Sequence, residues 1–131
     1  EVDAAKLASV ADEVARLYPG VAVVSAAAND EQVRACRAAD IVVQATPVGM
    51  KQTDAPLLGA EAFRAGQRAF DLIYMYPETV FMGEARKGGA RTANGLGMLL
   101  HQGARAFSIW TGREPDVEAM RRALQNAVYG S

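Results

Sequence analysis

Hydrophobic positions along the chain follow two periods, one typical of helices and one typical of buried strands. Apolar residues recur at helical spacing and predict helices over residues 3–18, 30–38, 79–87, 95–110 and 116–129, with a shorter helical pattern inside 56–66. Short β-branched or apolar runs between them predict strands over residues 21–25, 40–45, 69–74 and 90–93. This alternation predicts an α/β fold with a doubly wound parallel sheet and right-handed crossovers.

The segment 39–50 contains the pattern around which the rest of the sheet is expected to form. Its residues 41–43 are an unbroken β-branched run, which favours a central parallel strand that helices cover on both faces. Thr46 and Pro47 follow in a turn-prone loop at the carboxyl end of that strand. Because open α/β sheets bind their ligands at such ends, we expect the functional site there.

Composition narrows the class of partner. The 131 residues are half hydrophobic and carry 14 basic against 15 acidic side chains with no charged run, which argues against nucleic acid or a membrane surface and favours a small molecule. No apolar run approaches the roughly 20 residues that span a bilayer. Cys36 is the only cysteine, so an internal disulfide and a multi-cysteine metal site are excluded, and we expect a cytoplasmic protein.

A dinucleotide-binding fold normally opens with a Gly-rich turn between its first strand and first helix. No G-x-G-x-x-G precedes the first predicted helix, and the Gly95-Leu-Gly97 sequence introduces a helix near the other end. Two alternatives follow. Either the chain is not a dinucleotide fold, or its opening unit lies upstream of Glu1, in which case the chain is a piece of a larger protein.

Three segments in register resemble the shikimate dehydrogenase family, including its quinate/shikimate relatives. They are residues 40–50 (DIVVQATPVGM), residues 71–74 (DLIY) with Pro77 and Thr79, and residues 94–102 (NGLGMLLHQ) followed by Ala106, Phe107 and the Trp-Thr-Gly of 110–112. Their order and spacing are similar to those of the family's C-terminal, nicotinamide-cofactor domain. The resemblance implies that residues 1–131 form a partial Rossmann-like domain without its first βα unit, ending in helices that pack back towards a substrate domain outside the chain.

The resemblance also implies roles for single residues. Thr46, Pro47 and Val48 would border the adenosine and ribose side of the cofactor, and Leu72, Gly95 and Met98 its nicotinamide end. Tyr74 and Gln102 would contact the substrate. Each also has an ordinary structural interpretation: Met98 as core, Gln102 as a solvated helix residue, Tyr74 as a packed strand end, and Thr46-Pro47 as a turn with Gly49 at positive φ.

Met98 and Gln102 are four residues apart on one predicted helix and therefore share a face. An apolar side chain beside an amide that both donates and accepts hydrogen bonds suits a polyhydroxylated ring. His101, the only histidine, points about 100° away from Gln102 around the helix. We therefore expect His101 to be packed or exposed rather than catalytic.

Cofactor choice depends on the first residues. NADP-using members of the family resemble one another in an Asn-Arg-Thr-like motif whose arginine meets the 2′-phosphate, and Glu1-Val-Asp3 aligns there. Val2 cannot contact a phosphate through a charge, whereas Glu1 could accept hydrogen bonds from free ribose hydroxyls. The cofactor is expected to be NADP or NAD, with NAD favoured by Glu1.

No catalytic residue and no metal ligand is predicted in this chain. In the resembled family, a Lys and an Asp of an N-terminal substrate domain carry the proton transfer, and nothing here matches that motif. Lys6, Lys51 and Lys87 are expected on a covering helix, in a loop and at a helix end, positions that suit solvent. Cys36 has no basic partner nearby in sequence and is expected to be a buried thiol. We expect this segment alone to lack turnover.

The resemblance implies an oxidoreductase of aromatic amino acid biosynthesis that interconverts 3-dehydroshikimate and shikimate by hydride transfer, with quinate open as a further substrate. Its expected partners are the small-molecule substrate and the N-terminal domain of the same protein, and a homodimer is an open alternative. A non-catalytic dinucleotide-binding or regulatory domain is the alternative function. Another Rossmann enzyme, such as a methylenetetrahydrofolate dehydrogenase, is disfavoured by the segment 95–102.

Overall fold

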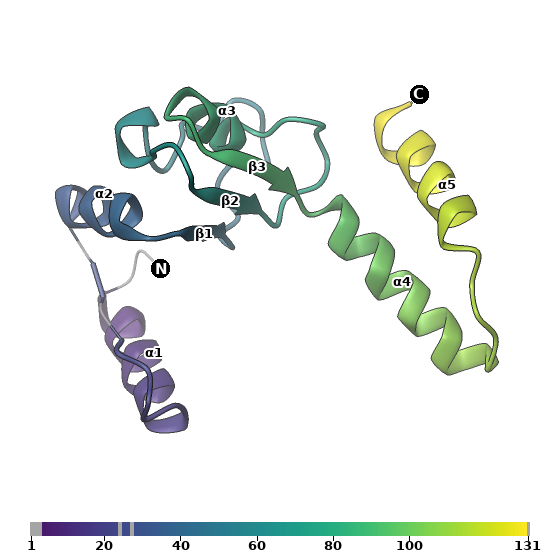
Figure 1. The fold of residues 1–131 in the computed structure, drawn as a ribbon, viewed down its shortest axis with the longest axis horizontal. Coiled ribbons are helices and arrows are strands. Elements are labelled where there is room, and N and C mark those ends of the chain that lie inside the picture. The colour runs from purple at the N-terminus through teal and green to yellow at the C-terminus, as the bar shows by residue number, and fades with distance from the viewer. Residues whose placement is uncertain (1–3, 24, 27, 131) are drawn as a thin grey trace.

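The computed structural model describes residues 4–23, 25–26 and 28–130 (Figure 1). Three parallel strands form one sheet in the order β1-β2-β3: β1 (Ile41–Gln44), β2 (Arg68–Asp71) and β3 (Arg91–Asn94). Helices precede and connect them, so the expected Rossmann-like α/β class is confirmed as a partial fold.

The helices are α1 (Ala4–Leu17), α2 (Asn29–Ala38), α3 (Val80–Lys87), α4 (Leu96–Thr111) and α5 (Val117–Tyr129), with a short 3₁₀ turn, η1 (Ala60–Ala62). Side-chain caps explain where two of these helices begin. Thr79 accepts a hydrogen bond from the Met82 amide before α3, and Asp116 accepts one from Ala119 before α5. The helical pattern inside 56–66 shortens to η1. The helix boundaries otherwise agree with the predictions within about two residues.

The core lies on one face of the sheet. Phe63 after η1 and Phe81 of α3 meet edge to face with ring centroids 5.5 Å apart. Around them α2, η1 and α3 bury small and sulfur-containing side chains against β2. This core consists of Cys36, Ala62, Phe63, Ala69, Phe81, Met82, Ala85 and Ala90. The sheet is therefore packed against helices on one face.

The opposite face of the sheet is open among the described residues. Ile41 is 62% exposed and Val43 55% exposed, and the paired Phe70 and Ala93 lie on the same face as Val43. The prediction of a central strand covered on both faces is wrong for β1 in this structure. β1 is an edge of the described sheet and β2 is its centre, because no described strand pairs with the outer edge of β1.

The strand predicted over residues 21–25 is also wrong for its described residues, since 21–23 and 25 adopt no strand. A hydrophobic run becomes a strand only where a neighbour supplies hydrogen bonds, and no described strand does so here. Helix α1 forms as predicted but projects away from the sheet (Figure 1), with Val10 and Leu17 more than half exposed. It covers no part of the described core. Asp3, at the predicted start of this helix, lies outside the described residues.

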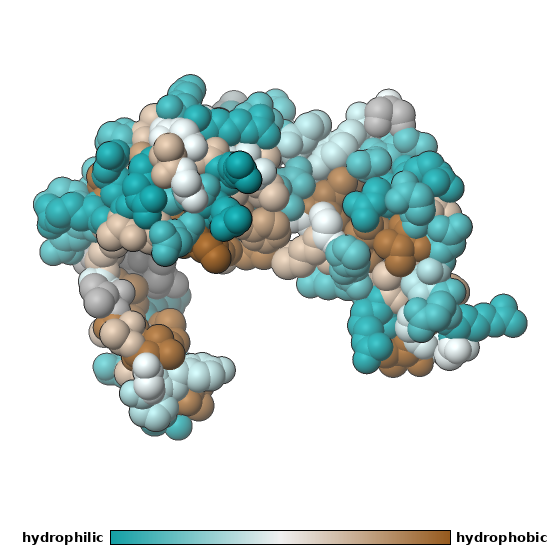
Figure 2. Space-filling view, viewed as in Figure 1, coloured by the Kyte–Doolittle hydropathy of each residue, from teal (hydrophilic) through white to brown (hydrophobic). Residues whose placement is uncertain are grey.

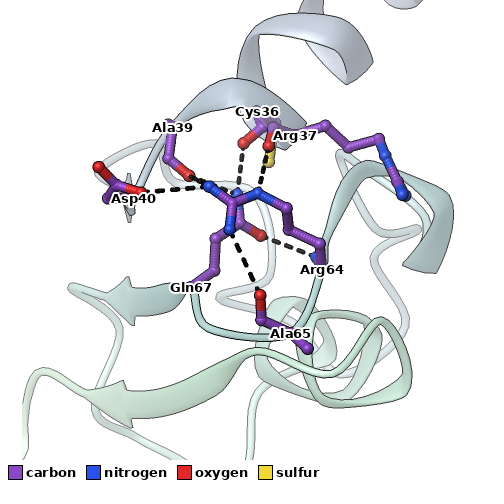
Figure 3. A network of polar contacts seen from close by, with 7 residues as sticks. All are labelled: Cys36, Arg37, Ala39, Asp40, Arg64, Ala65 and Gln67. Atoms are coloured by element: carbon purple, nitrogen blue, oxygen red, sulfur yellow. Dashed lines mark hydrogen bonds and ion pairs between the residues drawn. The ribbon is translucent and has the colours of Figure 1, made fainter.

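A polar network joins the end of α2 to the segment before β2 (Figure 3). The fully buried Gln67 amide donates to the carbonyls of Cys36 and Ala39, and the Arg64 guanidinium donates to the Arg37 carbonyl at 2.7 Å. Terminal helix carbonyls otherwise lack partners, so these donors cap α2. They also fix the direction in which the chain enters β1.

Helices α4 and α5 form an antiparallel pair beyond the sheet (Figure 1). An apolar groove of about 410 Å³ lies between them, and Figure 2 shows hydrophobic surface over this pair. The groove is lined by Leu99, Leu100, Gly103, Met120, Ala123 and Leu124. Across the described part of the chain, none of the helices has the length and apolar character needed to cross a membrane.

Candidate functional site

The carboxyl ends of the three parallel strands meet at one edge of the sheet. Gln44, Asp71 and Asn94 are paired across the strands as their last residues, so the loops that follow start side by side. Thr46 follows β1, and Leu72 follows β2. This is the edge at which α/β sheets bind ligands.

A pocket of about 180 Å³ opens between the loops after β1 and β2. It is lined by Ala45, Thr46, Met50, Leu72, Ile73, Tyr74 and Met75. Three of these residues, Thr46, Leu72 and Tyr74, were predicted from sequence as site residues, and the structure brings them together. The pocket is smaller than the roughly 300–1,000 Å³ of sites for whole drug-sized ligands, so it suits one ring of a larger molecule.

Gly95 brings the loop after β3 against the loop after β2. A Cβ placed on Gly95 would lie 2.1 Å from the Leu72 carbonyl oxygen, which no side chain tolerates. The Gly95 amide donates to the Ile73 carbonyl at 3.2 Å. Glycine is thus required here by the close approach of two backbones.

Gln44 shapes the loop after β1, and sequence reasoning missed it. Its buried side chain accepts from the Thr46 amide at 2.6 Å and donates to the Val48 carbonyl at 2.7 Å. Buried polar groups need such partners. The only signal in the sequence was an amide side chain at the end of an apolar strand.

Asp54 holds the second half of the same loop. Its carboxylate accepts hydrogen bonds from the amides of Gly49 at 2.9 Å and Lys51 at 3.2 Å. These bonds, with the charge of Lys51, hold the pKa of Asp54 below its usual value. Gly49 has a φ of +99°, so the turn requires glycine, and a Cβ there would lie 3.4 Å from Ile73.

Asp71 and Thr79 close the loop after β2. Asp71 is fully buried and accepts from the Thr79 hydroxyl at 2.6 Å and from the Ile73 amide at 3.0 Å. Thr79 in turn caps α3. The two ends of the segment that carries Leu72 and Tyr74 are therefore tied together, a contact that the sequence did not reveal.

The C-terminal stretch matches a known family. Residues 95–125 match the model of the Shikimate 5'-dehydrogenase C-terminal domain. The chain is 45% identical over 92 residues to the shikimate dehydrogenase (NADP(+)) of Methanocella arvoryzae, covering 70% of this chain and 34% of that protein. It is 51% identical over 87 residues to the enzyme of the same name from Methanocaldococcus jannaschii, covering 65% and 31%.

Solved structures agree. A shikimate dehydrogenase in complex with NADP⁺ has a TM-score of 0.78 and 38% identity, over 92% of this chain and 42% of that one. The chain belongs to the shikimate dehydrogenase family. A quinate dehydrogenase from Corynebacterium glutamicum in complex with NAD has a TM-score of 0.75 and 31% identity, over 92% and 43%. The chain spans about a third of the length of the curated shikimate dehydrogenases that it matches.

The remaining residues that the family resemblance singled out lie outside the pocket lining. Pro47 is exposed and Val48 is half-buried in the loop that Gln44 holds. Met98 is half-buried and Gln102 is exposed, one turn apart on α4 beyond Gly95. Glu1 lies outside the described residues, and so does the whole Glu1-Val-Asp3 motif.

The only histidine and the only cysteine lie apart from the pocket lining. His101 is exposed on α4. Cys36 is buried, and burial raises the pKa of its thiol, which disfavours the reactive thiolate. Among the residues that the structure describes, no cluster of three or more His, Cys, Asp or Glu could hold a metal ion.

Proposed function

We propose that this chain is the cofactor-binding part of a dehydrogenase that interconverts 3-dehydroshikimate and shikimate, with quinate as a further candidate substrate. One observation carries the proposal: Thr46, Leu72 and Tyr74 line one pocket at the strand ends, and the Gly95 backbone packs against Leu72 beside it. The names of the curated relatives support the same activity.

The residues at this edge fit a nicotinamide dinucleotide. Leu72, Gly95 and Met98 would hold its nicotinamide end, where backbone carbonyls and an apolar side chain suit a flat amide-bearing ring. Thr46, Pro47 and Val48 would border its adenosine and ribose side. When bound, the cofactor supplies the hydride acceptor or donor. The protein contributes orientation, because hydrogen bonds made by Gln44, Asp54 and Asp71 hold the loops around the site.

Tyr74 and Gln102 would contact the substrate. The amide of Gln102 is exposed on α4 and offers both donors and an acceptor to ring hydroxyls. The rest of the substrate site would come from an N-terminal domain of the same protein, which would also supply the Lys and Asp for proton transfer. The apolar groove between α4 and α5 supports packing of this pair towards that domain. This segment alone is expected to be inactive.

We propose NAD over NADP on the basis of Glu1 and Val2. A carboxylate accepts hydrogen bonds from the free ribose hydroxyls of NAD and repels the 2′-phosphate of NADP. The curated relatives are named for NADP(+), whereas the quinate dehydrogenase neighbour contains NAD. The two cofactors must therefore be compared directly.

The test is NAD- and NADP-linked oxidation of shikimate and of quinate by the longest form of the protein that contains this chain, alongside residues 1–131 alone. Activity is expected only in the longer form, and Gln102→Ala should raise the KM for the substrate. Gln125→Ala, an exposed glutamine of α5, is the matched control. If the longer form oxidises neither substrate, the dehydrogenase proposal fails, and a non-catalytic dinucleotide-binding domain becomes the better account.

A further inference from the structure

The last residue of α5 reaches back to the loops of the strand-end site. The Tyr129 hydroxyl donates to the Tyr74 carbonyl at 3.0 Å and accepts from the Asn94 side-chain amide at 2.8 Å. The Tyr76 carbonyl lies 3.4 Å from the same hydroxyl. Tyr129 is separated from Tyr74 by 55 residues, so this contact joins the end of the chain to the loop after β2.

Asn94 extends the contact to the start of α4. Its amide nitrogen also donates to the Tyr76 carbonyl at 2.9 Å, and its amide oxygen accepts from the Leu96 backbone N–H at 3.2 Å. Asn94 directly precedes Gly95, whose backbone packs on Leu72. One side chain thus joins the loop after β2, the first turn of α4 and the phenol of Tyr129.

We propose that Tyr129 and Asn94 are positioning residues for the nicotinamide end of the site. They hold the Tyr74 segment at a fixed distance from Gly95, so that the pocket is formed before the cofactor binds. This inference rests on the proposed function, since it concerns the same pocket. Neither side chain lines the pocket, and both would act through the backbones of Tyr74 and Gly95.

The physical basis is the cost of unpaired, partly buried polar groups. Without the Tyr129 hydroxyl, the Tyr74 carbonyl loses a donor and Asn94 loses an acceptor. The loop then populates more conformations, and a ligand that needs one of them must select it. The affinity should therefore fall only for ligands that carry the group contacting this loop.

A truncated ligand separates this role from simple stabilisation of α5. The dissociation constants of NAD⁺ and NADP⁺ are measured by calorimetry with the longest form of the protein. ADP-ribose and its 2′-phosphate, which lack the nicotinamide, are measured in the same way as the truncated counterparts. Tyr129→Phe should raise the dissociation constant of the tighter-binding dinucleotide about three- to tenfold, the loss expected for one or two hydrogen bonds. It should raise the dissociation constant of the matching truncated ligand less than about twofold. Tyr18→Phe, an exposed tyrosine after α1, should change neither.

Asn94→Ala provides a second variant. It should weaken dinucleotide binding with the same selectivity. The double variant should lose less binding free energy than the sum of the two single variants, because Tyr129 and Asn94 share one contact. Equal weakening of whole and truncated ligands, or no weakening of either, overturns the positioning role while the proposed function stands. If the wild-type protein binds no dinucleotide, the proposed function fails and this inference with it.

Discussion

Gly95 and the carbonyl of Leu72 approach so closely that a Cβ on Gly95 would lie 2.1 Å from the Leu72 oxygen. The φ of Gly95 is −72°, which any residue can adopt, so the constraint is space rather than backbone conformation. The contact sets the separation between the loops after β2 and β3. It therefore also sets the shape of one side of the strand-end pocket.

Replacing Gly95 with alanine is expected to force the two backbones apart. The variant should be destabilised by about 1–3 kcal/mol, as for other overpacked sites, and should bind the dinucleotide more weakly. Urea unfolding and calorimetry measure the two effects. Gly83→Ala, in the middle of α3 where a Cβ meets nothing within 4 Å, should instead stabilise by about 0.5–1 kcal/mol. A Gly95→Ala protein with unchanged stability and affinity would contradict the close contact.

Thr79→Val removes one hydroxyl with two functions. That hydroxyl donates to Asp71 and caps α3 by accepting from the Met82 amide. Valine keeps the shape but leaves one oxygen of the buried Asp71 carboxylate without its donor and removes the cap of α3. We expect a loss of about 2–4 kcal/mol in the free energy of unfolding. Thr79→Ser keeps the hydroxyl and should stay within about 1 kcal/mol of wild type. A loss in Thr79→Ser as large as that in Thr79→Val, or no loss in Thr79→Val, would contradict this role of the hydroxyl.

Asp54 should contribute to the acid sensitivity of the fold. Its pKa is lowered in the folded state by the amides of Gly49 and Lys51. Its stabilising effect is therefore complete above the ordinary Asp value of about 4 and is lost as the pH falls below that value through the folded-state pKa. Asp54→Asn should be less stable than wild type at pH 7, and the difference in urea midpoint should narrow below about pH 4. A constant difference across this range would contradict the assignment.

The elements that could be predicted from sequence are those with local signals. Helix α5 has its cap Asp116 and a regular apolar spacing, and the loop after β1 has Thr46 and Gly49 directly after a β-branched run. The family resemblance rests on local segments too, among them the loop after β1. The resemblance assigned Thr46 to the ribose side of a cofactor, Leu72 to its nicotinamide end and Tyr74 to the substrate, and the structure places these three residues around one pocket. Their individual roles stay predictions.

The features that could not be predicted depend on contacts between distant segments. Gln44, Asp71 and Asn94 all end strands, and their importance appears only when the register places them at one edge. The contact between Tyr129 and Tyr74 requires α5 to fold back along α4, which no local pattern encodes. The strand expected over residues 21–25 failed for the same reason, because strands need a partner as well as a hydrophobic run.

The central claim is that a nicotinamide dinucleotide binds at the strand ends, and the five methionines of the chain test it directly. Met50 and Met75 line the pocket and Met98 lies on α4 beyond Gly95, whereas Met82 is in the core and Met120 lines the groove between α4 and α5.

The decisive measurement is an NMR titration of the longest form of the protein, labelled with ¹³C-methyl methionine and assigned by single Met→Leu variants, with NAD⁺ and NADP⁺. We predict that the methyl signals of Met50, Met75 and Met98 shift on saturation while those of Met82 and Met120 stay in place. Shifts confined to Met82 or Met120, or no shift at all with either cofactor, would contradict the assignment of this site.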